Sequence, residues 1–188
     1  KITGVSIDSR KVKKGHIFFA LKGREFDGNL FINSALKSGA AAVITSQNYK
    51  SKYIKNKIPI IRVKNPKKKL SEICAKFYSE KPKNIIAVTG TNGKSSVANF
   101  FHQILSHNKI PVATIGTLGI TQNNKNKKIK LTSPDIVTLH KTLQEIKKKG
   151  IENVMLEASS HGLDQGRLDN IKFKAGIFTN FSQDHLDY

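Results

Sequence analysis

The sequence has very little cysteine, no tryptophan and few acidic side chains. A single cysteine excludes an intrachain disulfide, and the cytoplasm is the expected compartment. No apolar run approaches the roughly 18 residues of a membrane-spanning helix, and no signal-peptide pattern is visible, so no membrane span is expected. Hydrophobic residues still make up 38% of the 188 residues, which allows a packed core and argues against general disorder.

Acidic residues number 13 against 33 lysines and arginines, for a formal net charge of +20. Such an excess is compatible with a nucleic-acid-binding surface or with a lysine-rich solvated one. The lysines form short runs at expected loops and helix ends, with few aromatics among them, whereas single-strand binders interleave aromatics that stack on bases. We therefore expect no nucleic-acid partner, although part of the charge could assist binding of a polyanionic nucleotide.

The first part of the chain alternates strand-like and helix-like patterns. Short apolar runs predict strands at 5–7, 17–21, 41–45 and 58–63. Helical spacing predicts a helix over 31–38, ended by Gly39, and another around 70–77, closed by Pro82. Cys74 lies on the apolar face of the second helix and is expected to be a buried small residue. These patterns predict a small α/β domain over residues 1–82.

A second unit is predicted over residues 83–188. Strands are expected at 85–88, 112–115, 154–156 and 175–178. A helix follows the first of them with five apolar residues on one face, Val97, Phe100, Phe101, Ile104 and Leu105, and a second helix around 139–149 ends at Gly150. The polar stretch 119–130 is expected to be a mobile hairpin or loop. This alternation predicts an α/β fold with a parallel sheet covered by helices, and we expect the unit to be incomplete because the chain stops just after a strand.

The segment from Thr89 to Ser96 follows a buried strand and opens a helix, which is the layout of a phosphate-binding loop. Glycines let backbone N–H groups turn toward phosphates, and the helix N-terminus adds partial positive charge. The Lys94 ammonium can reach the β- and γ-phosphates, and the Ser95 hydroxyl can bind Mg²⁺. The spacing departs from the general P-loop pattern, because Val88 stands where the first glycine belongs and Gly90 replaces it.

The compact loop resembles the ATP loop of the Mur ligase family and of its folylpolyglutamate synthetase relatives. Further segments resemble the members of that family that add the third peptide residue to a UDP-N-acetylmuramoyl dipeptide. In chain order they are Ile7-Asp8-Ser9-Arg10, Gly15 to Ala20, Gly23 to Gly28, Thr132-Ser133-Pro134-Asp135, Glu157 to Arg167, Thr179-Asn180-Phe181 and Asp184 to Tyr188. The resemblance covers essentially the whole chain, in family order.

This resemblance implies an ATP-dependent ligase of peptidoglycan synthesis. It would add a diamino acid, meso-diaminopimelate or L-lysine, to UDP-N-acetylmuramoyl-L-alanyl-D-glutamate through an acyl phosphate. It implies a uridine-nucleotide domain followed by the first part of a P-loop ATPase domain, with a C-terminal domain and a carbamylated lysine beyond Tyr188. The given chain alone is therefore expected to be inactive, and a monomer is expected. A Mur ligase of another step and a non-catalytic nucleotide- or nucleic-acid-binding module are the alternatives.

The resemblance also implies roles for individual residues around ATP and Mg²⁺. The expected ATP-binding residues are Gly90, Thr91, Asn92, Gly93, Lys94, Ser95 and Ser96. Ser95, Glu157 and His185 are the expected metal ligands, and Lys94, Glu157 and His185 the expected catalytic residues. The place of Glu157 supports its role independently, because a carboxylate at the carboxyl end of a parallel strand near a P-loop suits a Mg²⁺ ligand.

The expected substrate-binding residues are Ser9, Arg24, Glu25, Phe26, Thr132, Ser133, Ser159, Gln165 and Arg167. The Arg167 guanidinium can hold an anionic group with two parallel hydrogen bonds. For Asp8 and Arg10, an ion pair that shapes the loop and a ligand contact remain equally open, and a structural role is favoured for His161. A serine-hydrolase function for Ser159 to His161 is rejected, since no Gly-x-Ser-x-Gly elbow is present.

Overall fold

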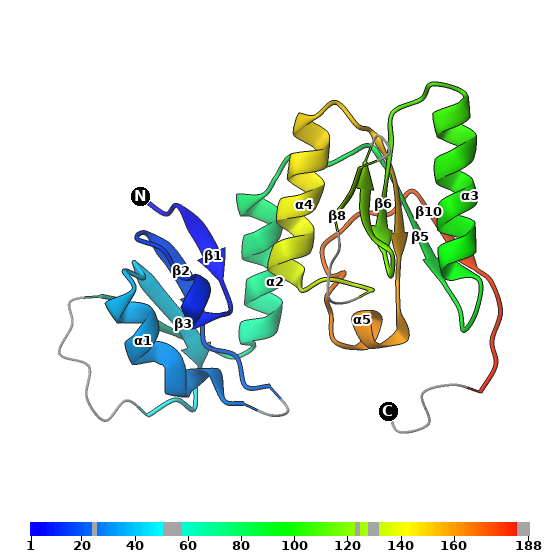
Figure 1. The fold of residues 1–188 in the computed structure, drawn as a ribbon. Helices are drawn as coiled ribbons and strands as arrows, with labels where there is room; N and C mark the ends of the chain where they lie inside the picture. Colours follow the sequence, from blue (N-terminus) through cyan, green and yellow to red (C-terminus); the bar gives the residue numbers. More distant parts are fainter. Residues whose placement is uncertain (24–25, 51–57, 123–124, 128–131, 184–188) are drawn as a thin grey trace. The chain divides into compact units, whose positions relative to one another are not determined.

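The computed structural model describes residues 1–23, 26–50, 58–122, 125–127 and 132–183 (Figure 1). The chain forms two compact units, Lys1–Phe77 and Tyr78–Tyr188. The boundary proposed from the sequence, 82/83, lies shortly after this division, in the connection that leads into the second sheet.

The first unit is a four-stranded parallel sheet in the order β1-β2-β3-β4. Its strands are β1 (Gly4–Ser6), β2 (His16–Phe19), β3 (Ala42–Ser46) and β4 (Ile60–Val63). Its helices are the 3-10 turns η1 (Ser9–Lys11) and η2 (Gly28–Phe31) and the α-helices α1 (Ile32–Lys37) and α2 (Pro66–Phe77). The helix expected over 31–38 is therefore found as η2 running directly into α1. Cys74 on α2 is fully buried, as predicted.

The second unit is built on a six-stranded sheet in the order β10-β5-β9-β6-β7-β8. The strands are β5 (Asn84–Thr89), β6 (Val112–Gly116), β7 (Gly119–Gln122), β8 (Lys125–Lys127), β9 (Asn153–Glu157) and β10 (Ala175–Phe178). The expected parallel pairing is confirmed for β10, β5, β9 and β6. β7 and β8 extend the sheet as antiparallel strands, because a turn of two residues after β6 can only reverse the chain. They pair with each other inside the stretch 119–130, where a hairpin or loop was expected.

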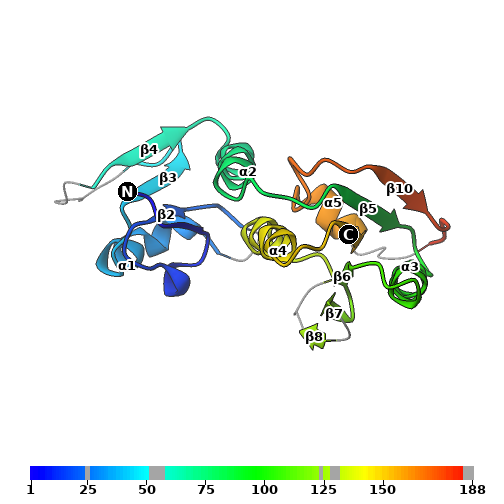
Figure 2. The same cartoon turned by 90° about the horizontal axis from the view of Figure 1, so that it is seen from above.

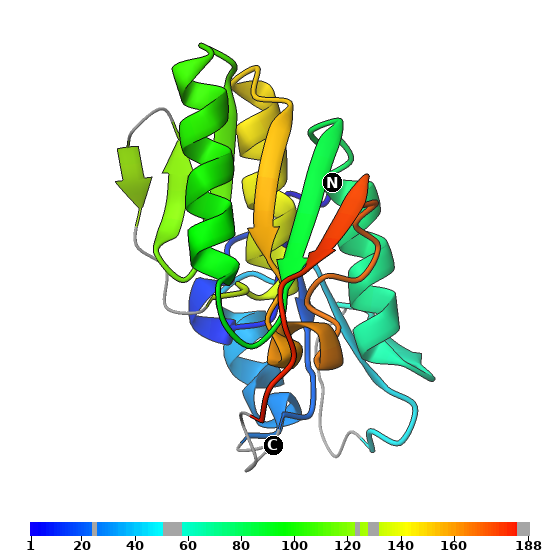
Figure 3. The ribbon, with the colours of Figure 1, turned by 90° about the vertical axis from the view of Figure 1, so that its right-hand side faces the viewer.

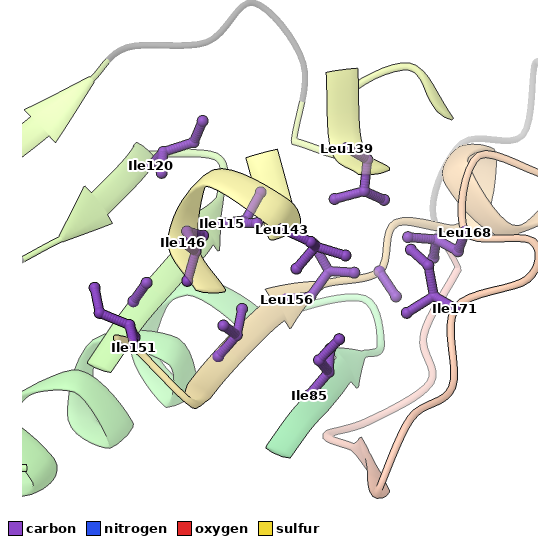
Figure 4. Packing of buried hydrophobic residues seen from close by; sticks show 13 residues of the cluster. Ile85, Ile115, Ile120, Leu139, Leu143, Ile146, Ile151, Leu156, Leu168 and Ile171 are labelled. Atoms are coloured by element: carbon purple, nitrogen blue, oxygen red, sulfur yellow. The ribbon is translucent and has the colours of Figure 1, made fainter. Parts of the chain in front are cut away.

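The two faces of this sheet are covered by different helices (Figures 2 and 3). On one face α4 (Ile136–Lys148) packs Leu139, Leu143 and Ile146 into a core with Ile85 and Leu156 (Figure 4). On the other face α3 (Lys94–His107) packs against the alternate residues of the same strands, Val88 and Met155. The central strands β5 and β9 thus bury both of their faces, because side chains alternate along a strand.

The expected apolar face of α3 is only partly buried. Val97 and Phe101 pack against the sheet beside Ala98, but Phe100 and Ile104 are 60% and 61% exposed. A helix on a sheet buries only the stripe that faces the strands, and the apolar residues of α3 spread over a wider arc than that stripe. The sheet therefore covers only part of the apolar face that the sequence predicted.

A short helix, α5 (Ser160–Asp164), follows β9. Ser159 caps it, its Oγ accepting the N–H of Gly162 at 3.1 Å. The segment lacks an apolar period, so only the cap signals a helix in the sequence. Among the described residues, no helix combines the length and apolar character needed to cross a membrane.

Candidate active site

The carboxyl ends of four parallel strands meet at one edge of the second sheet. The phosphate loop follows β5, Glu157 ends β9, Thr117 follows β6, and residues 179–182 follow β10. Ligand sites of open α/β sheets form at this edge, because the loops that leave the strands converge there. The fold therefore brings together segments that are far apart in the sequence.

The phosphate loop has the backbone that its glycines predict. Gly90 and Gly93 adopt φ of +132° and +84°, and a Cβ on Gly90 would lie 2.1 Å from Thr179 Oγ1. α3 begins directly after Gly93, so its first N–H groups face the loop. Val88 is fully buried within β5. This explains why the first glycine of the loop is Gly90 and not residue 88: residue 88 belongs to the strand, and the turn starts after it.

Lys94 lies over the mouth of this loop. Its ammonium donates hydrogen bonds to the backbone oxygens of Gly90, at 2.6 Å, and of Thr91, at 2.8 Å. Both acceptors belong to the loop itself. The positive charge is thus held where the loop N–H groups and the helix N-terminus already favour an anion.

A second segment, residues 179–182, holds the phosphate loop from the side of β10. Thr91 N donates to the Asn180 backbone oxygen at 3.1 Å, and Asn92 N donates to Asn180 Oδ1 at 3.0 Å. Thr179 Oγ1 donates to the Asn92 backbone oxygen at 2.6 Å. In the sequence this segment was recognised only as a family motif, and its hydrogen bonds show that it holds the phosphate loop in position.

Glu157 is a buried carboxylate, 2% exposed, at the end of β9. Its Oε2 accepts the hydroxyl hydrogens of Ser95 and Thr117, each at 2.9 Å. A Cβ on Gly116 would lie 2.0 Å from Glu157 Oε1, so glycine is needed beside the carboxylate. A carboxylate and a serine hydroxyl in contact are hard oxygen donors, and this donor set fits Mg²⁺.

A small cavity of about 50 Å³ adjoins this carboxylate and is lined in part by Ser95, Glu157 and His102. Burial lowers the pKa of His102 below its ordinary value, which favours its neutral form. Among the described residues, no three His, Cys, Asp or Glu side chains are grouped so that they could hold a metal ion. His185, the other expected metal ligand, lies outside the described residues.

Residues 132–135, which lead into α4 and are called the Thr132 loop below, are joined to β9 and to the cap of α5 by hydroxyl groups. Ser133 is fully buried, its Oγ donates to the Glu157 backbone oxygen at 3.0 Å, and Ser159 N donates to that Oγ at 3.2 Å. The Ser133 hydroxyl is thus engaged within the protein, which favours a positioning role over contact with a ligand. Thr132 Oγ1 lies 3.0 Å from Thr117 Oγ1.

Arg167 lies beside the same loop and is joined to two other residues predicted for the site. Its Nη1 donates to the Ser133 backbone oxygen at 2.8 Å, and its Nε donates to Gln165 Oε1 at 3.0 Å. Five of the nine expected substrate residues are therefore gathered around one loop, namely Thr132, Ser133, Ser159, Gln165 and Arg167.

The remaining expected substrate residues belong to the first unit. Ser9 begins η1 and is 6% exposed, and Phe26 is 67% exposed, whereas Arg24 and Glu25 lie outside the described residues. The Arg10 guanidinium forms a two-point ion pair with Asp8, at 2.8 and 2.9 Å, and its hydrogen bond holds the Asp8 carboxyl pKa below its ordinary value. Of the two alternatives for these residues, the structure shows the ion pair.

The first unit also has an open groove of about 570 Å³ at the carboxyl edge of its sheet. Its lining is mostly polar and basic and includes Lys22, Asn29, Tyr49, Lys64 and Lys67. A groove of this size can accommodate a nucleotide-sized ligand.

The second unit thus has the fold and the loop of a P-loop nucleotide-binding protein. Two family models match the chain: "Mur ligase middle domain" over residues 88–188, and "Mur ligase family, catalytic domain" over residues 1–78. The chain belongs to the Mur ligase family.

Curated relatives agree over the whole chain. The UDP-N-acetylmuramoyl-L-alanyl-D-glutamate–2,6-diaminopimelate ligase of Brucella melitensis biotype 1 is 43% identical over 188 residues, covering 100% of this chain and 38% of that protein. The ligase of the same name from Rickettsia montanensis is 46% identical over 192 residues, covering 100% and 39%. The chain therefore spans well under half the length of these relatives.

Solved structures similar to this chain are also Mur ligases. A UDP-N-acetylmuramoyl-L-alanyl-D-glutamate–2,6-diaminopimelate ligase superposes with a TM-score of 0.80 at 32% identity, covering 98% of this chain and 37% of that one. The MurF ligase of Thermotoga maritima in complex with ADP superposes with a TM-score of 0.57 at 26% identity, covering 88% and 34%.

Three residues contribute to the site without having been assigned a role in it from the sequence, although Asn180 belongs to a motif named there. Thr117 contacts the buried carboxylate, Gly116 leaves room for it, and Asn180 holds the phosphate loop. Gly116 ends the buried strand β6 and Thr117 directly follows it, and that position was the available signal.

Proposed function

We propose that the chain provides the nucleotide-sugar and ATP sites of a ligase that joins diaminopimelate to UDP-N-acetylmuramoyl-L-alanyl-D-glutamate. The observation that carries the proposal is the buried Glu157, whose carboxylate lies 2.9 Å from the Ser95 hydroxyl of the phosphate loop and whose backbone oxygen accepts the Ser133 hydroxyl. Relatives that bear this name match the chain from end to end, which supports the choice of substrate and of the added amino acid.

The chemistry requires activation of a carboxylate, which is a poor electrophile. A carboxylate oxygen of the nucleotide-sugar peptide attacks the γ-phosphorus of ATP, and the bond from that phosphorus to the bridging oxygen of ADP breaks. The amine of the incoming amino acid then attacks the acyl phosphate carbon, and phosphate leaves with the electron pair of the broken C–O bond. Such transfers depend on positioning and on positive charge more than on acid–base groups.

The phosphate loop would hold the ATP phosphates through the backbone N–H groups of residues 90–96 and the N-terminus of α3. The Lys94 ammonium would exchange its contacts with the Gly90 and Thr91 carbonyls for phosphate oxygens, which carry more negative charge. The ADP in the Thermotoga maritima relative supports this assignment.

Ser95, Glu157 and His185 would hold Mg²⁺. When bound, the ion neutralises charge on the phosphoryl oxygens. Thr132, Ser159, Gln165 and Arg167 would position the peptide and sugar-phosphate part of the substrate, with Ser133 holding their loop in place. Ser9, Arg24, Glu25 and Phe26 would contact the uridine part.

A direct assay tests the whole proposal. The intact protein is incubated with ATP, Mg²⁺, the UDP-N-acetylmuramoyl dipeptide and either diaminopimelate or L-lysine. We expect ADP release that depends on the dipeptide, and a tripeptide product with diaminopimelate. A product formed only with lysine would contradict the choice of amino acid, and ADP release without any dipeptide dependence would contradict the ligase.

A further inference from the structure

Thr117 lies in the two-residue turn between β6 and β7 and was not among the expected site residues. Its hydroxyl donates to Glu157 Oε2 at 2.9 Å and lies 3.0 Å from Thr132 Oγ1. One side chain therefore contacts both the proposed metal ligand and the loop proposed for the nucleotide-sugar.

The direction of these hydrogen bonds follows from counting hydrogens. A threonine hydroxyl has one hydrogen, and Thr117 gives it to an acceptor-only carboxylate. The hydrogen between the two threonines must then come from Thr132. Ser95 donates to the same Oε2, so a continuous chain runs from Thr132 through Thr117 to Glu157 and on to the phosphate loop.

The side chain of Thr117 is not required for the turn. Gly116 and Gly119 pair across the hairpin, and Gly119 supplies the positive φ, +111°. Thr117 itself is exposed to solvent, so no core packing depends on it. Its hydroxyl contacts are thus separable from the stability of the fold.

We propose that Thr117 is a positioning residue that couples the two binding events of the proposed ligase. Its hydroxyl orients the Glu157 carboxylate toward the phosphate loop, which favours Mg²⁺-nucleotide binding there. The same hydroxyl oxygen accepts the hydrogen bond from Thr132, so the position of the carboxylate constrains the Thr132 loop. Binding at either site therefore strengthens binding at the other. This inference rests on the proposed function.

The test compares Thr117→Val, which keeps the shape and loses the hydroxyl, with Thr117→Ser, which keeps the hydroxyl. Calorimetry on the intact protein measures ADP affinity in Mg²⁺ and in EDTA, and the affinity for the UDP-N-acetylmuramoyl dipeptide with and without Mg²⁺-ADP. In Thr117→Val we expect the Mg²⁺-dependent gain in ADP affinity to fall by about tenfold or more, as for loss of one hydrogen bond to a charged group. The coupling to the dipeptide should vanish, and Thr117→Ser should restore both.

Two further variants separate positioning from general damage. Thr132→Val should lose the coupling but keep the Mg²⁺-dependent gain, because Thr117 still donates to Glu157. Thr142→Val, at a buried threonine of α4 outside the site, should keep both, and thermal unfolding should be similar in all variants.

An unchanged gain and unchanged coupling in Thr117→Val would overturn the inference while leaving the ligase intact. The inference is also overturned if Thr117→Ser loses as much as Thr117→Val, since the hydroxyl would then not be the cause of the losses. If the unaltered protein shows no Mg²⁺-dependent ADP binding, the proposed function fails, and this inference fails with it.

Discussion

At the residue scale, the site depends on a buried carboxylate that fits only beside glycine. A Cβ on Gly116 would meet Glu157 Oε1 at 2.0 Å, well inside contact distance, and Gly116 has no positive φ that would add backbone strain. Gly116→Ala should therefore displace the carboxylate from Ser95 and Thr117. We expect the Mg²⁺-dependent ADP affinity to fall by at least about tenfold, measured by calorimetry.

Gly176→Ala is the matched control, since a Cβ there meets nothing within 4 Å on an exposed strand of the same sheet. It should leave ADP binding unchanged. Equal losses in the two variants would show that the effect comes from the sheet as a whole and not from the carboxylate.

A second prediction concerns His140, which is fully buried on α4. Its Nε2 donates to the Asp169 backbone oxygen at 3.2 Å, and its Nδ1 has no partner among the described residues. Burial, with a smaller contribution from the charge of Lys81, lowers the His140 pKa to about 4. The unfolded chain, with a pKa near 6.5, then binds this proton more tightly than the folded one.

Stability should therefore be complete above about pH 6.5 and fall as the pH drops toward 4. The loss from this residue is at most about 3 kcal/mol. Urea unfolding at pH 7 and pH 4.5 measures it, with His140→Gln as the non-titrating comparison. A pH profile of His140→Gln as steep as that of the unaltered protein would assign the loss to other groups.

At the element scale, the phosphate loop joins three elements, β5, α3 and the segment after β10. Lys94→Ala removes the ammonium that lies over the loop and leaves the backbone in place. We expect ATP binding to be lost in calorimetry, because a full charge at the phosphates disappears, while the intact protein keeps its affinity for the nucleotide-sugar.

Lys174→Ala controls for the change in net charge. Lys174 belongs to the same unit but contacts Asn84 at the start of β5, the end of the strand away from the loop. Its loss should leave ATP affinity unchanged. ATP binding that survives in Lys94→Ala would remove the basis for the P-loop assignment.

The elements also show how far the sequence could predict the structure. Apolar periodicity and glycine boundaries located the parallel strands and the long helices, and the phosphate loop followed from the order of strand, glycine-rich turn, Lys94-Ser95 and helix. The exposure of Phe100 and Ile104 could not be predicted, since periodicity shows an apolar arc but not how much of it the sheet covers. Thr117 escaped prediction because its role depends on the pairing of β6 with β9, a long-range contact with no local pattern.

At the scale of the whole molecule, the positive charge is unevenly divided. Residues 1–77 carry 18 lysines and arginines against four acidic residues, a formal charge of +14. Residues 78–188 carry 15 against nine, or +6. Most of the excess thus lies in the unit with the lysine-lined groove, so a compact anion and a long polyanion are both conceivable ligands by charge alone.

Salt dependence distinguishes the two. A protein that contacts six to ten phosphates of a nucleic acid loses about 10³ to 10⁵ in affinity for it between 50 and 200 mM salt, because many counterions are released on binding. The UDP-N-acetylmuramoyl dipeptide carries a diphosphate and two carboxylates but no condensed counterion layer, so its binding to a shaped site should weaken by less than about tenfold over that range. We expect the intact protein to bind the UDP-N-acetylmuramoyl dipeptide with this shallow dependence, and a random oligonucleotide only weakly near physiological salt. Fluorescence anisotropy for the oligonucleotide and calorimetry for the nucleotide-sugar give the two slopes. Tight oligonucleotide binding that persists at 200 mM salt, together with no nucleotide-sugar binding, would make the charge a nucleic-acid surface and contradict the ligase assignment.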